Sequence, residues 1–72
     1  MNKYLFTVSS RFCSKKVSYF RHLPKDTLME DMVTAIAQEA FPELRQVTLP
    51  DVSDDELYES LAILVERRKK HV

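Results

Sequence analysis

Cysteine and histidine can act as metal ligands, nucleophiles and bases, and this chain has few of them. It contains Cys13, His22 and His71. A structural zinc site takes four ligands, so these three side chains cannot complete one. A Cys13–His22 nucleophilic pair would also need a substrate pocket and an oxyanion site, which are hard to build in 72 residues. Glycine is absent, which excludes Gly-rich phosphate loops. We therefore expect a protein that is not an enzyme and that has no catalytic, metal-binding or cofactor-binding residues.

A second group of candidates is basic and aromatic and lies near the N-terminus. Cations that follow phosphates and rings that stack on bases are combined in single-stranded nucleic-acid platforms. The alternative is that the rings fill a core while the cations solvate strand edges. Tyr19 and Phe20 have opposite parity in a predicted strand, so one of them must point away from the core. The residues expected to bind a partner are Arg11, Lys15, Lys16, Tyr19, Phe20, Arg21 and His22.

Charges are sorted along the chain, although 11 basic and 11 acidic residues cancel in total. Residues 1–25 hold six basic and no acidic residues, residues 26–66 hold all 11 acids and one base, and residues 67–72 add four bases. The acids near residues 51–59 either dock a basic partner or stabilise a helix start. The basic tail either binds phosphates or is a solvated helix end. We take it as a secondary basic patch, made of Arg67, Arg68, Lys69 and Lys70.

Five elements are predicted to position these residues. Period-two patterns over 4–12 and 17–23 predict a basic β-hairpin within residues 3–23, with a loop longer than a tight turn at 13–16. Capping boxes at Thr27–Glu30 and Ser53–Glu56 start helices over 27–41 and 53–70. Pro42 is expected to end the first helix, and residues 44–49 read as a short strand stopped by Pro50.

These elements predict one small α+β domain over residues 1–72. Its order is β-β-α-β-α, and both helices pack on one face of a three-stranded sheet. The other face is left open to solvent or to a partner.

The N-terminus gives no targeting signal. Its apolar stretch is interrupted at Ser9, well short of a signal peptide, and the longest strictly apolar run is Leu61–Val65. A lone cysteine fits a reducing compartment. We expect a cytoplasmic protein with no membrane partner.

Part of the chain loosely resembles the ribbon-helix-helix repressors. A strand over 17–23, the pair Leu23-Pro24 and a capped helix carry the likeness. It implies a strand that pairs with its twin in a dimer and reads the major groove with Arg21 and Tyr19, or with Ser18, Phe20 and His22. Residues 41–52, which separate the helices, and the extra strand over 4–12 depart from the family, so no family is assigned.

The function expected from these features is regulation by binding. We expect a non-catalytic inhibitor, modulator or adaptor that binds another protein and forms a homodimer; its size would fit an accessory protein of a phage or plasmid. The alternative is a nucleic-acid-binding regulator that uses the basic hairpin and the basic tail. The acidic middle of the chain opposes this alternative unless it faces away from the hairpin.

Overall fold

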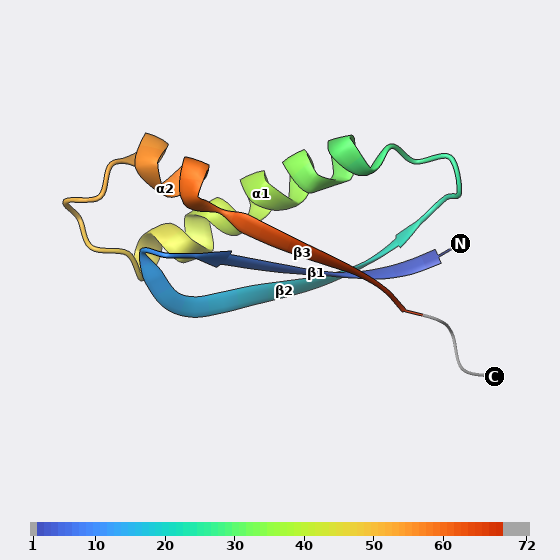
Figure 1. Cartoon of the computed structure of the whole chain (residues 1–72), viewed down its shortest axis with the longest axis horizontal. Helices are drawn as coiled ribbons and strands as arrows, with labels where there is room; N and C mark the ends of the chain where they lie inside the picture. The colour runs from blue at the N-terminus through green and yellow to red at the C-terminus, as the bar shows by residue number, and fades with distance from the viewer. Residues whose placement is uncertain (1, 69–72) are drawn as a thin grey trace.

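The structure, a computed structural model, describes residues 2–68. Its elements are β1 (Asn2–Ser10), β2 (Cys13–Leu23), α1 (Met29–Gln46), α2 (Asp54–Ser60) and β3 (Ala62–Arg68). The strands form one antiparallel sheet in the order β2-β1-β3, and both helices lie on the same side of it (Figure 1). The expected fold class is therefore confirmed: a three-stranded sheet with two helices on one face.

The hairpin forms because alternate residues of β1 and β2 are apolar. Phe6 and Val8 of β1 are buried, and they pair in register with Tyr19 and Val17 of β2. The expected loop at 13–16 is wrong, because only residues 11–12 form the turn and β2 already starts at Cys13. Residues 13–16 do not alternate between apolar and polar side chains, so the sequence predicts no strand there. The register shifts between Val8 and Ser10, which absorbs the tight connection without a positive φ in the described chain.

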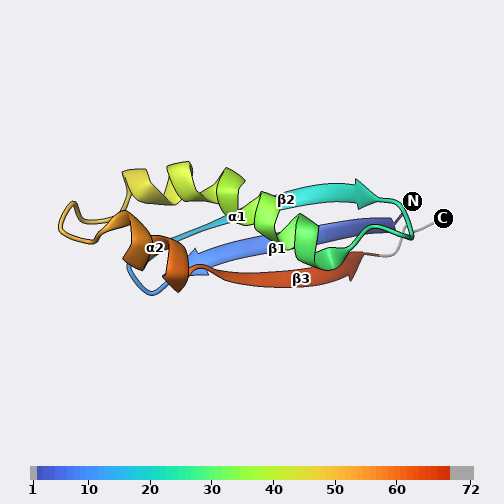
Figure 2. The same ribbon diagram turned by 90° about the horizontal axis from the view of Figure 1, so that it is seen from above.

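Helix α1 covers the sheet with its apolar face. Ile36, Ala40 and Leu44 are buried and belong to the same core cluster as Phe6 and Val8. Seen from above, α1 crosses the sheet obliquely (Figure 2). Ile36, Ala40 and Leu44 are spaced four residues apart, close to the helical period that the sequence displays.

The capping box expected at Thr27–Glu30 is not formed. The N-cap of α1 is Leu28, which makes no side-chain cap. Thr27 lies one position earlier and donates its backbone N–H to the carbonyl of Pro24, at 3.2 Å. A capping box requires its threonine at the N-cap itself, so the shift of one residue removes it.

The expected helix end at residue 41 and the expected strand at 44–49 are wrong. Helix α1 continues through Pro42 to Gln46. Proline leaves one helical carbonyl without its N–H donor, that of the exposed Gln38, which water can satisfy. Continuing the helix brings Leu44 fully into the core, and this burial outweighs the local penalty.

The helix expected over 53–70 is correct only at its start. Ser53 and Glu56 form the capping box, but α2 ends at Ser60. β3 follows, so the observed order is β-β-α-α-β. The apolar run at 61–65 fits either a strand or a buried helix by periodicity alone. Antiparallel pairing with β1, which sets Val65 opposite Phe6, decides for the strand.

Candidate functional site: the open face of the sheet

The open face is the side of the sheet opposite the helices. Residues of odd number in β1 and even number in β2 and β3 point to it, because side chains alternate along a strand. The registers arrange these residues in rows across the three strands. No described element packs on this face. Its residues in the paired rows are Lys3, Leu5, Thr7, Ser9, Ser18, Phe20, His22, Ala62, Leu64, Glu66 and Arg68; Ser14 and Lys16 share this parity in β2 but lie at the register shift near the turn.

Three large apolar side chains form a stripe on the open face. Phe20 on β2 pairs with Leu5 on β1. Leu64 on β3 pairs with Thr7, two residues along β1 from Leu5. Phe20 is 54% exposed and Leu64 is 59% exposed. We call Phe20, Leu5 and Leu64 the apolar stripe. It runs diagonally across all three strands, and the helices bury none of it.

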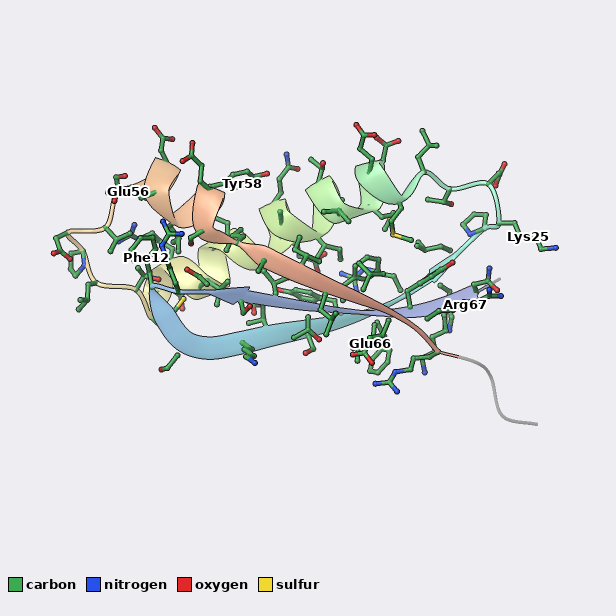
Figure 3. The ribbon with its side chains drawn as sticks, viewed as in Figure 1. Phe12, Lys25, Glu56, Tyr58, Glu66 and Arg67 are labelled. Atoms are coloured by element: carbon green, nitrogen blue, oxygen red, sulfur yellow. The ribbon has the colours of Figure 1, made fainter. Side chains whose placement is uncertain are left out.

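A basic row lies beside the apolar stripe. His22, Lys3 and Arg68 are neighbours across β2, β1 and β3, and all three are exposed. The Lys3 Nζ atom lies 4.6 Å from the centre of the Phe20 ring, within the range of a cation–π contact. Glu66 is the single acid of this face, below the sheet in Figure 3, and its Oε2 lies 3.5 Å from Arg68 Nη2.

The row on the other side of the stripe is uncharged. Ser18 and Thr7 pair across β2 and β1, and Ser9 pairs with Ala62 further along. In its paired rows the open face is thus basic at one end, apolar in the middle and small and polar toward the turn.

The four predicted partner-binding residues at 19–22 of β2 are divided between the two faces of the sheet. Phe20 and His22 point to the open side, whereas Tyr19 and Arg21 point to the helices. Arg21 Nη2 donates to both carboxylate oxygens of Glu39 on α1. The Arg21 guanidinium also lies 5.3 Å from the centre of the Tyr19 ring. Arg21 therefore ties β2 to α1, and neither Arg21 nor Tyr19 lies on the open face, where the sequence placed them.

The Tyr19 hydroxyl is the one described buried side-chain polar atom without a hydrogen-bond partner. Burial, followed by the negative charge of Glu43, an interaction of the Glu43 carboxylate with the hydroxyl that falls outside hydrogen-bond geometry, and the charge of Glu39, raises the pKa of Tyr19 above its usual value of 10.0. All of these effects disfavour the phenolate. Tyr19 is thus a half-buried residue that packs against the core with its hydroxyl unpaired.

Arg11, Lys15 and Lys16 lie at the turn end of the hairpin, away from the basic row. All three are exposed. The Arg11 guanidinium carbon lies 4.8 Å from the centre of the Phe12 ring, which Figure 3 labels at the turn. These cations form a separate basic end of the sheet and are not joined to Phe20 and His22 in one site.

The secondary basic patch is divided by the fold. Arg67 and Arg68 are consecutive in β3 and therefore point to opposite faces. Arg67 Nη2 donates to Asn2 Oδ1 at 3.1 Å on the helix side, and Arg68 joins the basic row. Lys69 and Lys70 lie outside the described residues.

Several residues of the open face were not anticipated from the sequence. Leu5 is an apolar residue among the polar odd-numbered residues of β1, and this position could have indicated an apolar side chain on the open face. Lys3 shares that parity. Leu64 and Glu66 were assigned to a helix, so their position beside β1 depends on the strand pairing that only the tertiary structure reveals.

The structure separates the charges by layer. The sheet layer (residues 2–23 and 61–68) contains seven basic residues and one acid. The helix layer (residues 24–60) contains ten acids and two basic residues. Because the helices lie on the side opposite the open face, the acidic layer faces away from a ligand bound there.

Cys13 and His22 are far apart. They lie near opposite ends of β2, nine positions apart, which corresponds to about 30 Å along a strand. Thr48 Oγ1 lies 3.5 Å from the Cys13 sulfur and donates to the Leu44 carbonyl oxygen at 2.6 Å. Within residues 2–68, no three histidine, cysteine, aspartate or glutamate side chains are grouped so that they could hold a metal ion.

None of the described helices is long and apolar enough to cross a bilayer.

Comparison of the chain with protein-family models, with curated proteins and with solved structures found no significant match.

Proposed function

We propose that this chain is a non-catalytic interaction protein that binds another protein through the open face of its sheet. The observation that carries the proposal is the apolar stripe. Phe20 and Leu64 are more than half exposed at 54% and 59%, side by side with Leu5, and no described element covers them. A contiguous exposed apolar group with a polar and charged surround is typical of a protein-binding surface.

The proposal includes self-association as a homodimer and a cytoplasmic setting. The open face of three strands and about seven residues measures roughly 23 by 14 Å. A stable interface covers about 800 Å² of each partner, so pairing of two copies through this face is expected to be weak. It would bury the stripe when no other partner is bound.

The test compares three forms of the full chain as baits in a nuclease-treated cell lysate. Phe20→Asp places a charge in the stripe, and Leu49→Asp is the matched control, because Leu49 is 68% exposed in the loop before α2. Circular dichroism checks that all three fold. We expect the wild type and Leu49→Asp to capture a protein that Phe20→Asp loses. Capture of the same proteins by all three forms would contradict the proposal.

Single-stranded nucleic acid is the second candidate ligand, and the separation of charge by layer favours it. Ten of the eleven acids that opposed this candidate in the sequence lie in the helix layer, on the far side from Lys3, His22 and Arg68, and only Glu66 lies on the open face. Binding through phosphates weakens steeply with added salt, whereas binding through an apolar stripe is much less sensitive. A labelled oligonucleotide titrated at low and high salt separates the two candidates.

A further inference from the structure

The shape and charge of the open face indicate which kind of protein surface it takes; this inference rests on the proposed function. We propose that the occupant is an amphipathic α-helix with an acidic flank. Three observations carry it: the diagonal course of the apolar stripe, the orientation of the sheet's hydrogen-bonding groups, and the basic row beside the stripe.

Backbone hydrogen bonding limits which partners can dock on the open face. The N–H and C=O groups of a sheet lie in its plane, so the open face offers side chains only. An extended peptide laid on this face would leave its own backbone groups unpaired where it displaces water. A partner that docks face-on therefore needs its backbone bonds already made, as a helix or a sheet does.

The width of the apolar surface distinguishes a helix from a sheet as the partner. A packed sheet buries apolar residues across a broad face. Here each strand offers one large apolar side chain, and the stripe lies between a charged row and a small polar row. The stripe extends over two strand spacings across the sheet and over two residues along a strand, so it is about 12 Å long. Helix positions i, i+4 and i+7 span about 10.5 Å, so a single helix face matches it.

The charged residues beside the stripe set the charge of the helix. His22 and Lys3 border Phe20 and Leu5 along one side of the stripe. On β3, Glu66 lies between Arg68 and Leu64 and pairs with Arg68, and it is the single acid of this face in the described residues. A helix with glutamate or aspartate along that flank would meet this row, while a lysine flank would be repelled. The other flank meets Ser18 and Thr7, which place no demand on charge.

The test uses two synthetic peptides of equal helicity, verified by circular dichroism. Both carry leucine at i, i+4 and i+7, and they differ only in flanks of glutamate or lysine. Fluorescence anisotropy measures their binding to the full chain. We expect the glutamate peptide to bind at least about tenfold tighter than the lysine peptide, and we expect Phe20→Asp but not Leu49→Asp to abolish its binding. A Lys3→Glu, Arg68→Glu double variant should reverse the preference.

Other outcomes separate the two proposals. If neither peptide binds while Phe20→Asp still abolishes capture from lysate, the helix is the wrong occupant and the proposed function stands. If Phe20→Asp affects neither measurement, both proposals fail. Tighter binding of a single-stranded oligonucleotide than of the glutamate peptide overturns the helix, as does a homodimer that the peptide fails to dissociate.

Discussion

Tyr19 and Phe20 are consecutive residues with opposite surroundings. Phe20 lies on the open face under the Lys3 ammonium group, and Tyr19 packs against the core with its hydroxyl buried and unpaired. Their chemistry is similar, so the difference comes from the alternation of the strand. One ring is available to a partner, and the other contributes to stability.

Replacement of Tyr19 by phenylalanine removes the unpaired hydroxyl. A buried polar group without a partner destabilises by about 1–3 kcal/mol, so at neutral pH Tyr19→Phe should be as stable as the wild type or more stable by about 1 kcal/mol. Urea unfolding of both proteins gives this difference. A loss of more than about 1 kcal/mol would mean that the hydroxyl makes a stabilising bond.

Stability should also depend on pH through Tyr19. Its folded pKa is raised above the usual 10.0, so the folded state keeps the proton where the unfolded state loses it. The contribution is complete below about pH 10 and is lost as pH rises above that value. Between about pH 9 and about pH 11 the wild type should lose more stability than Tyr19→Phe. Equal losses would show that the folded state does not shift this pKa.

At the scale of elements, two capping boxes that look alike in sequence differ in the fold. Ser53 Oγ accepts from the Glu56 N–H at 3.2 Å, and Glu56 Oε1 accepts from the Ser53 N–H at 3.3 Å. Thr27 precedes the N-cap of α1 and makes no such pair. Only the first arrangement satisfies free amides at a helix start.

Alanine at each position tests that difference. Ser53→Ala should lower the free energy of unfolding by about 1 kcal/mol, and Thr27→Ala should change it by less than about 0.5 kcal/mol. Thermal or urea unfolding measures both. Equal changes in the free energy of unfolding would mean that the capping box at Ser53 does not stabilise α2.

Pro42 is the least favourable residue of α1 in local terms. Pro42→Ala supplies an N–H to the helix and removes a clash, although the unfolded chain gains entropy. We expect a net stabilisation of about 1–2 kcal/mol. The control is Gln38→Ala, at an exposed position of the same helix, with an expected change under about 0.5 kcal/mol. A destabilised Pro42→Ala would show that the proline conformation is used elsewhere in the fold.

At the scale of the whole molecule, opposite charges occupy opposite layers. Copies that pair face to face with their basic rows overlapping would repel each other, so a pair must be turned end for end. The row of His22, Lys3 and Arg68 then meets the small polar row of the second copy. This arrangement is favoured when salt screens the remaining repulsion.

The expected result is an average molar mass that rises with concentration and with salt. Light scattering after size exclusion measures it for the wild type and for Phe20→Asp, which should stay at the mass of one chain. A tight dimer at every concentration, unaffected by Phe20→Asp, would place the interface elsewhere on the molecule.

The sequence by itself determined the local features. Periodicity and capping act over a few neighbouring residues. They account for the alternation in β1 and β2, the apolar face of α1, the start of α2 at Ser53 and the exposed aromatic ring in β2. Only the tertiary structure decided that residues 44–46 are helical and that residues 62–68 are a strand, because burial of Leu44 and pairing with β1 override local preference. The open face depends on the same pairing, since Leu64 joins Leu5 and Phe20 only when β3 lies beside β1.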